Sequence, residues 1–298
     1  MLEKTILGAS LYVPATHKDL GKIANGELLS ELRSLIFCTE DAVADREFSF
    51  AMFNLSLTLQ QMSDRPKTGR YVRVRNPETL ERVLEMPGSK MLDGFVLPKA
   101  TSQNFDHYFH QIRKTDFKLM PTLETVEAFD ESEMKLFRQC LERPGVRDHI
   151  TALRIGGNDL LAILGVRRPR NMTIYKTPLG PVISRLATTF LPYGFSLTSP
   201  VFEHLDCEDI LATEMQEDIA HGMSGKTAIH PSQVPQIENH YRVSQSDMET
   251  ALKIIDPTSP GVFKFSNSMC EIATHRTWAY GVIAQAKLFG INKSSTIT

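Results

Sequence analysis

The sequence predicts an α/β fold built on a parallel sheet, and three observations support this prediction. Short apolar runs recur along the chain without strict polar and apolar alternation, as is typical of strands covered on both faces. Stretches with helical character separate them, so that strand followed by helix recurs about eight times. The length of 298 residues fits a single (β/α)8 barrel. An open doubly wound sheet fits the same pattern, although no GxGxxG motif follows the first strand.

The expected strands are the apolar runs Ser10–Val13, Leu35–Phe37, Tyr71–Val74, Gly94–Leu97, Lys118–Pro121, Ala152–Ile155, Phe195–Leu197 and Thr227–Ile229. The expected helices between them are Leu20–Leu32, Phe48–Met62, Pro77–Met86, Gln103–Lys114, Ser132–Glu142, Gly180–Leu191, Asp206–His221 and Ser246–Ile255. A last helix is expected over Ala273–Phe289, after an irregular segment Asp256–Ser268. We therefore expect a catalytic domain over residues 1–255 and a C-terminal helical extension over residues 256–298.

The overall composition is that of an ordinary soluble globular protein, with 42% hydrophobic and 23% charged residues. The net charge of −2 provides no global field that would attract nucleic acid or an acidic membrane. Four cysteines lie far apart without a CxxC pair, which predicts reduced thiols in the cytoplasm. The N-terminus contains acidic Glu3 and no long apolar run, so we expect neither a signal peptide nor a membrane span.

Charged residues follow most of the expected strands at the point where each strand ends. In a (β/α)8 barrel these strand ends surround one mouth, where catalytic groups lie. A single charged residue there is weak evidence, because strands commonly lead into polar loops. Six of them, most of them far apart in sequence, together predict a functional site. They are Glu40, Asp41, Arg73, Lys99, Glu124 and Asp159.

At these positions the chain resembles the HpcH/HpaI aldolase and citrate lyase beta-subunit family. The matching motifs occur in family order and span most of the chain: SLYVP (Ser10–Pro14), TEDAV (Thr39–Val43), YVRVRNP (Tyr71–Pro77), DGFVLPK (Asp93–Lys99), LET (Leu123–Thr125), GGNDLLAILG (Gly156–Gly165) and GMSGKTAIHPSQV (Gly222–Val234). The last motif and DGFVLPK are the most specific. Within the family, the chain is similar to a branch of carbon–carbon bond lyases linked by gene neighbourhood to tellurium-resistance clusters.

The resemblance implies a closed (β/α)8 barrel and a homo-oligomer, a trimer or hexamer, in which the C-terminal segment completes a neighbour's site. It implies a Mg2+-dependent lyase or aldolase, with Mn2+ as a possible substitute. The substrate class is a 2-oxo or 3-hydroxy acid or its acyl thioester, cleaved through a metal-stabilised enolate. Two other functions stay open: a metabolite-binding barrel with altered catalysis, and a related phosphoenolpyruvate or pyruvate enzyme.

Glu124 and Asp159 match the family's metal ligands. Two carboxylates, together with waters and substrate oxygens, suit the oxygen-rich octahedron that Mg2+ or Mn2+ prefers. The alternative is that each acid caps or begins a helix. Gly156 and Gly157 would let the backbone pass close to the ion or substrate, and Asn158 belongs to the same substrate-binding motif.

The remaining site residues have catalytic or substrate-binding roles in this interpretation. Arg73 matches the family arginine that grips a carboxylate and stabilises an enolate oxygen, although neighbouring Arg75 makes the alignment ambiguous. Glu40 and Asp41 match an acidic pair that orients Arg73 or holds metal-bound water, while a helix N-terminus that favours acids is the simpler explanation. Lys99 is expected to contact a substrate carboxylate or an acid at the mouth.

Several departures from the family pattern predict altered substrate specificity with retained metal chemistry. Gly8 stands where the family carries an arginine, and Cys38 stands near the position of a family aspartate. Pro200 replaces a glycine after the seventh strand. These changes weigh against coenzyme A as the carrier. In the C-terminal segment Glu271 takes the place of an aspartate, which keeps the charge of a catalytic base and extends its reach.

Overall fold

The computed structural model describes residues 5–64 and 68–292 of the chain. Glu3 and the tail 293–298 lie outside the described residues. The chain divides into two compact units, Met1–Val234 and Pro235–Thr298. Within the described ranges, no helix is both long enough and apolar enough to cross a lipid bilayer.

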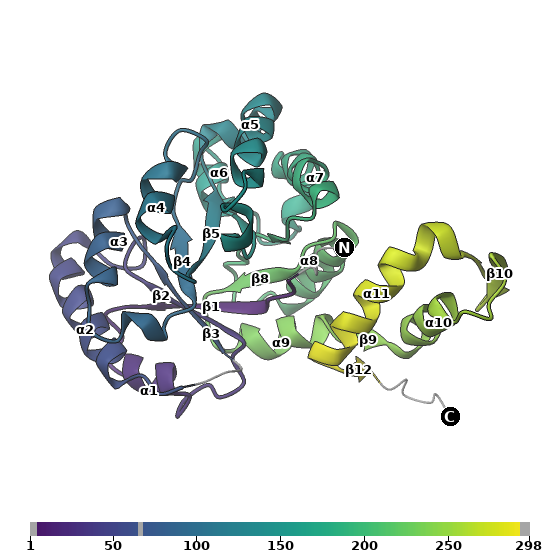
Figure 1. Cartoon of the computed structure of the whole chain (residues 1–298), viewed down its shortest axis with the longest axis horizontal. Coiled ribbons are helices and arrows are strands. Elements are labelled where there is room, and N and C mark those ends of the chain that lie inside the picture. Colours follow the sequence, from purple (N-terminus) through teal and green to yellow (C-terminus); the bar gives the residue numbers. More distant parts are fainter. Residues whose placement is uncertain (1–4, 65–67, 293–298) are drawn as a thin grey trace. The chain divides into compact units, whose positions relative to one another are not determined.

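The first unit is the predicted (β/α)8 barrel. Its eight parallel strands follow one another in the order β7-β6-β5-β4-β3-β2-β1-β8, and a parallel bridge between Ser199 and Lys226 joins the two ends of this sheet. The closed barrel is therefore confirmed over the open sheet (Figure 1). The strands are β1 (Gly8–Pro14), β2 (Ser34–Cys38), β3 (Gly69–Arg73), β4 (Gly94–Leu97), β5 (Lys118–Leu123), β6 (Leu153–Ile155), β7 (Leu197–Thr198) and β8 (Gly225–Ala228).

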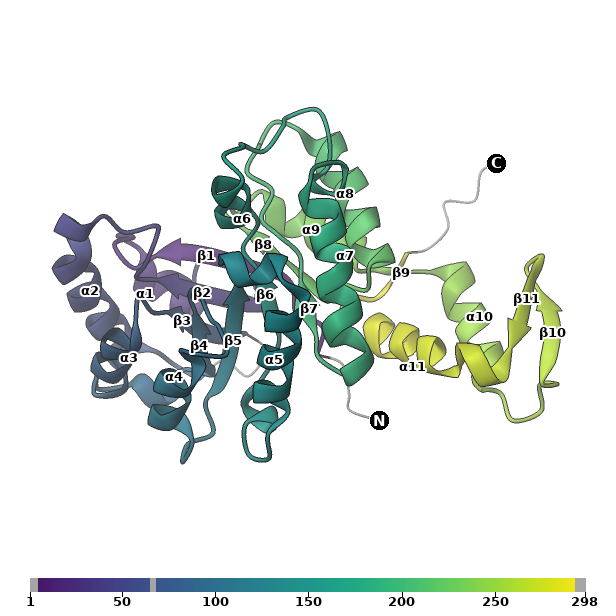
Figure 2. The same cartoon turned by 90° about the horizontal axis from the view of Figure 1, so that it is seen from above.

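Helices lie outside the strands, with α2, α3 and α4 along one side and α5, α7 and α8 along another (Figures 1 and 2). Two helices were not expected: α6, at Gly157–Ile163, and α9, at Gln233–His240. The expected first helix is shorter than predicted, because Gly26 ends it in a left-handed conformation with φ +67°. The other barrel helices are α1 (Leu20–Asn25), α2 (Phe48–Gln61), α3 (Pro77–Leu84), α4 (Phe105–Ile112), α5 (Glu131–Glu142), α7 (Leu179–Phe190) and α8 (Glu208–Ala220).

An apolar core fills the barrel below the mouth. Its buried residues pair in register across neighbouring strands, for example Ile36 with Tyr71 and Val96 with Met120, so they point to the same side. Branched and aromatic side chains of this kind close the interior of such barrels. The members of this core are Leu7, Ile36, Tyr71, Val96, Met120 and Ala152, with partly buried Tyr12 packed against them.

The second unit is a small helical element with a hairpin. Helices α10 (Gln245–Ile255) and α11 (Ile272–Phe289) pack around buried Ala251, Ile254 and Ala279. The segment expected to be irregular contains strand β10 (Val262–Phe265), which pairs antiparallel with β11 (Ser268–Glu271). Ser266 and Asn267 make the tight turn with positive φ, a conformation that asparagine tolerates better than most residues. Strands β9 (Val243–Ser244) and β12 (Ile291–Asn292) complete this unit.

Candidate active site

Strand alternation brings the site residues into the barrel mouth. A residue an even number of positions after an interior residue points to the same side of its strand. Arg73 comes two residues after interior Tyr71, and Glu124 comes four residues after interior Met120. Gly156 follows interior Ala152 by the same interval. The apolar core thus forms the floor beneath a ring of polar groups.

We define the mouth cluster as Glu40, Asp41, Arg73, Lys99, Glu124 and Asp159. Arg73 lies at its centre, and its Nη2 contacts Glu40 Oε2 at 2.7 Å, Asp41 Oδ2 at 3.1 Å and Glu124 Oε1 at 3.1 Å. Burial lowers the pKa of Arg73, but nearby Tyr12 and the charges of Glu124, Glu40 and Asp41 raise it by more. Arg73 therefore stays a cation that holds together three acids from two strand ends, those of β2 and β5.

Glu124 is the most deeply buried acid of the mouth cluster, with only 2% of its surface exposed. Its Oε1 accepts a hydrogen bond from the backbone nitrogen of Lys99 at 2.8 Å. Burial and the nearby charge of Asp159 raise the pKa of Glu124 to about 7, although Arg73 lowers it. A Cβ at Gly156 would lie 2.5 Å from Glu124 Oε2, so a side chain there would displace the carboxylate.

Asp159 lies in the first turn of α6, directly after the glycine pair. Its pKa is raised by burial and then by the charge of Asp41, while Arg73 and Lys99 act in the opposite direction. Gly156, three residues before Asp159, lies against the Glu124 carboxylate. The structure therefore brings both predicted metal ligands to one mouth.

Glu40 and Lys99 complete the ring around Arg73. Lys99 Nζ lies 3.6 Å from Glu40 Oε1, and Lys99 itself has φ +48°, an uncommon conformation for a residue with a side chain. Burial raises the pKa of Glu40, against the opposing charge of Arg73. Asp41 is the accessible acid of the cluster, with 59% of its side chain exposed.

Arg75 takes no part in the mouth cluster, because β3 ends at Arg73 and strand alternation does not continue. Its guanidinium donates to the carbonyl oxygens of Thr39 at 2.7 Å and Val43 at 2.6 Å. It also pairs with Asp45 and stacks over the ring of Phe48 at 4.3 Å. Arg75 therefore secures the loop that carries Glu40 and Asp41.

Two predicted site residues form hydrogen bonds with residues that do not belong to the mouth cluster. Asn158 is exposed, and its Nδ2 donates to Glu203 Oε2 at 3.2 Å. Glu271 belongs to the second unit, where it precedes α11 and its Oε2 accepts from Thr274 Oγ1 at 3.1 Å. Their roles in substrate binding and catalysis stay predictions.

The sequence interpretation missed Tyr12 and the acids of a second group of buried charges. Tyr12 packs on the interior core and lies in register with interior Ile36, so it faces the barrel interior. Its position on the barrel face of the first strand was the available signal. The second group contains Glu214 and Asp218 on α8, together with Lys226 on β8.

The donors in the mouth cluster suit a hard divalent cation with few protein ligands. Within residues 5–64 and 68–292, no group of three or more histidines, cysteines and acids is arranged to enclose an ion. Mg2+ commonly uses one or two carboxylates and leaves its other positions to water and substrate. Four carboxyl groups share the two cations Arg73 and Lys99 in the described part of the chain, so acids outnumber cations in the mouth cluster.

A closed (β/α)8 barrel with convergent acids at its mouth defines a class of barrel enzymes whose catalytic groups come from several strand ends. Residues 1–291 match the family described as the C-C bond lyase of the TIM-barrel fold. The chain belongs to this family of carbon–carbon bond lyases, which confirms the resemblance drawn from its motifs.

Curated relatives and solved structures agree with this membership. The chain is 26% identical over 285 residues to the mitochondrial citramalyl-CoA lyase of Homo sapiens, covering 89% of this chain and 81% of that protein. It is 28% identical over 246 residues to a (3S)-malyl-CoA thioesterase of Cereibacter sphaeroides, covering 81% and 79%. CitE of Mycobacterium tuberculosis, in complex with magnesium, acetoacetate and coenzyme A, has the same fold, with a TM-score of 0.69, 20% identity, and coverage of 95% and 98%.

Proposed function

We propose that the mouth cluster binds Mg2+ through Glu124 and Asp159 and cleaves or forms a carbon–carbon bond in a 2-oxo or 3-hydroxy acid or its acyl thioester. The observation that carries this proposal is that Arg73 contacts three acids at the barrel mouth, Glu40, Asp41 and Glu124. Asp159 follows β6, the strand that pairs with the Glu124 strand β5. The magnesium in the solved CitE complex and the acyl-CoA chemistry named for the curated relatives support it. Mn2+ would fit the same donors.

Arg73 is the residue that orients the substrate. Its Nη2 already serves three acids, while its buried Nε has no hydrogen-bond partner in the described part of the chain. A guanidinium with a spare N–H can hold a substrate carboxylate or carbonyl oxygen. Lys99 adds a second, exposed cation that can pair with a free carboxylate of the substrate.

Bond cleavage in a 3-hydroxy acid needs a base for the hydroxyl proton. Asp41 is the accessible carboxylate beside Arg73 and can accept this proton at Oδ2. As the hydroxyl carbon becomes a carbonyl, the electron pair of the broken bond moves towards the neighbouring carbonyl of the substrate. A divalent cation at Glu124 and Asp159 would act as a Lewis acid and offset the charge that develops there.

Glu40 supports this chemistry by its position. It contacts both Arg73 and Lys99, so it fixes the spacing of the two cations that hold the substrate. The raised pKa of Glu40 makes it a second carboxyl group able to hold a proton near the reacting atoms.

The experiment that tests the function combines metal binding with product detection. Glu124→Gln and Asp159→Asn should each abolish Mg2+-dependent cleavage of oxaloacetate, 2-oxo acids, β-hydroxy acids or citramalyl-CoA, and should abolish Mn2+ binding measured by electron paramagnetic resonance. Asp45→Asn is the matched control, because it makes the same change on an exposed acid that pairs with Arg75 outside the mouth cluster. Full activity in either ligand variant would show that the ligands are wrongly assigned.

We also propose that Glu271 serves as a base in the site of a neighbouring copy, in a trimer or hexamer. A glutamate at the N-terminus of α11 keeps its carboxylate accessible, since Glu271 is only partly buried. Mixing Glu271→Gln with Asp159→Asn chains should restore part of the activity if sites combine residues from two chains. Absence of restoration in confirmed mixed oligomers would exclude this arrangement.

We infer a cytoplasmic location from four cysteines that are all free.

A further inference from the structure

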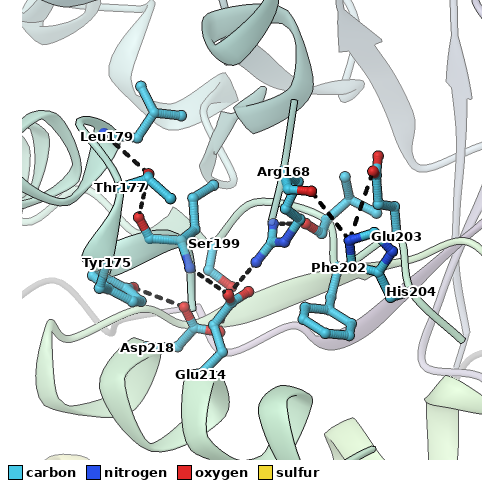
Figure 3. Close-up of polar contacts among 12 residues, drawn as sticks. Arg168, Tyr175, Thr177, Leu179, Ser199, Phe202, Glu203, His204, Glu214 and Asp218 are labelled. Carbon is cyan, nitrogen blue, oxygen red and sulfur yellow. Dashed lines mark hydrogen bonds and ion pairs between the residues drawn. The ribbon is translucent and has the colours of Figure 1, made fainter. Parts of the chain in front are cut away.

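A second group of charged residues lies fully inside the protein, between β8 and α8. We define this interior cluster as Lys226, Glu214, Asp218 and Arg168, none of which exposes more than 3% of its surface. Figure 3 shows Arg168, Glu214 and Asp218 of this cluster. Lys226 Nζ contacts Glu214 Oε1 at 2.8 Å and Asp218 Oδ2 at 2.9 Å. Arg168 pairs with the other oxygen of Glu214. Two cations thus neutralise two carboxylates.

The side chain of Lys226 lies on the outer face of β8, so the interior cluster lies outside the barrel interior. Its neighbour Thr227 accepts a hydrogen bond from interior-facing Arg154, so Lys226 points outward to α8. The interior cluster therefore cannot contact a substrate that lies within the mouth. Any influence on the reaction has to pass through the segments to which it binds.

Both carboxylates of α8 reach those segments through hydrogen bonds. Glu214 Oε2 accepts from the backbone nitrogen of Ile174 at 2.8 Å. Asp218 accepts from Tyr175 Oη at 2.7 Å and from Ser199 Oγ at 2.8 Å (Figure 3). The interior cluster consequently fixes residues 174–175, in the loop that follows α6, and the segment that follows β7.

The same two segments form the surface on which α6 begins. A Cβ at Gly157 would lie 2.6 Å from the Cβ of Pro200, the residue after Ser199. It would also lie 3.0 Å from Cδ1 of Ile174. The backbone at Gly157 is therefore in close contact with both segments, and Asp159 follows two residues later in the first turn of α6.

We infer that the interior cluster positions Asp159 in the mouth cluster, by holding Ile174 and Pro200 against the start of α6. This inference rests on the proposed role of Asp159 as a metal ligand. Glu214 and Lys226 are then positioning residues, because they act through Ile174 and Gly157 and touch neither ion nor substrate. Groups behind a metal ligand commonly set its geometry, and replacing them weakens metal binding by roughly 10–100-fold.

The charge state of Glu214 suits this role. Burial raises the pKa of its carboxyl group, but the charges of Lys226 and Arg168 lower it by more, so Glu214 remains an anion. An anionic acceptor strengthens the hydrogen bond from the Ile174 nitrogen, since hydrogen bonds to charged groups are stronger than neutral ones.

The test measures Mn2+ affinity by electron paramagnetic resonance on the full chain, together with kcat and KM. Glu214→Gln should weaken Mn2+ binding by roughly 10-fold or more while the protein stays folded. Ile174→Val removes only the Cδ1 atom that faces Gly157 and keeps the interior cluster whole, so it should weaken binding several-fold even if Glu214→Gln does not fold. Leu141→Ala, in the buried core of α5, is the control for general destabilisation and should leave Mn2+ affinity unchanged.

The outcomes separate this inference from the proposed function. Loss of Mn2+ binding in Asp159→Asn with unchanged affinity in Glu214→Gln and Ile174→Val would overturn the positioning role alone. Unchanged affinity in Asp159→Asn would overturn the metal site itself. An equal loss of affinity in Leu141→Ala would mean that any destabilisation loosens the mouth, which also refutes a specific role for the interior cluster.

Discussion

The mouth cluster and the interior cluster both contain buried charges, yet they differ in the balance of cations and acids. In the interior cluster, two cations pair with two carboxylates, and each of the four residues exposes only 0–3% of its surface. In the mouth cluster, four carboxylates share Arg73 and Lys99. Buried charges are costly unless they are paired, so an excess of one sign indicates a missing partner. The difference distinguishes a structural group of charges from one that awaits a cation.

The two clusters also differ in hydrogen-bond completeness and backbone strain. Lys226 has three partners within 3.4 Å, whereas the buried Nε of Arg73 has none in the described part of the chain. Lys99 has a positive φ, and its backbone nitrogen binds Glu124. Strained backbone tends to occur at functional sites, where the surrounding structure maintains it. Both differences point to the mouth as the place of chemistry.

The largest expected effect concerns turnover and tests the role of Arg73 at the centre of the mouth cluster. Arg73→Gln should lower kcat/KM by about 10²- to 10³-fold, because the substrate loses its charged donor. Mn2+ affinity should rise, since one of two opposing cations is removed from the four acids. Kinetics and paramagnetic resonance measure the two effects separately.

The control for this substitution is Arg143→Gln, which changes a half-exposed arginine that pairs with Asp106 outside the mouth cluster and should leave turnover unchanged. If Arg73→Gln weakened Mn2+ binding instead, Arg73 would serve mainly to hold the acids in place.

The next effect concerns stability and belongs to the interior cluster. Lys226→Met should lower the free energy of unfolding by about 3–5 kcal/mol, because Asp218 would remain buried without its cation. The triple variant Lys226→Met, Glu214→Gln, Asp218→Asn should regain part of this loss, since fewer buried charges remain. Urea unfolding followed by circular dichroism provides the values. A loss below about 1 kcal/mol for the single variant would contradict a fully buried pair.

An intermediate effect comes from adding the cation that the mouth cluster is expected to bind. Mn2+ at about 100 times its dissociation constant should stabilise the folded chain by about 2.7 kcal/mol. Thermal unfolding with and without Mn2+, at equal ionic strength, measures this increment. Asp159→Asn should remove it. A stabilisation that persisted in that variant would place the cation elsewhere in the protein.

The smallest effect tests a single hydrogen bond of the interior cluster. Tyr175→Phe removes the donor to Asp218 Oδ1 but leaves Ser199 and Lys226 on the other oxygen. We expect a loss of about 1 kcal/mol in unfolding free energy. Tyr280→Phe, on a half-exposed tyrosine of α11, provides the comparison and should change almost nothing. Equal results for both variants would mean that the Tyr175 hydroxyl contributes little.

Much of the barrel could be predicted because its strands are apolar runs separated by helices. The observed ends of strands differ from the predicted ends where the strands are short, as in β7, which contains only Leu197–Thr198. Helix α6 was missed because it has seven residues and begins at a glycine, which is a poor helix former. Hydrophobic periodicity needs more residues than these elements contain.

The mouth acids could be predicted because barrel topology gathers strand ends, whatever their distance in sequence. The interior cluster could not be predicted from residue type, because acids on a helix usually face water. Spacing did contain a signal. Leu211, Glu214, Met215 and Asp218 follow the i, i+3, i+4, i+7 pattern of one helix face, and all four are buried. Acids at such core positions indicate buried partners.

Asn158 shows a different limit of sequence reasoning. It stands between Gly157 and Asp159 in a motif, but successive residues of a helix point in directions about 100° apart. Its side chain therefore binds Glu203, while Asp159 joins the mouth acids. A motif identifies a segment more reliably than it identifies which of its members reach the site.

The hydrogen bonds from Arg75 to the loop after β2 determine when this part of the site becomes ordered. The guanidinium holds two carbonyl oxygens of that loop, and its stacking on Phe48 restricts it further. The conformational entropy of the segment that carries Glu40 and Asp41 is thus lost during folding, before any ligand arrives. A ligand meets acids that are already arranged, and binding free energy need not be used to order them.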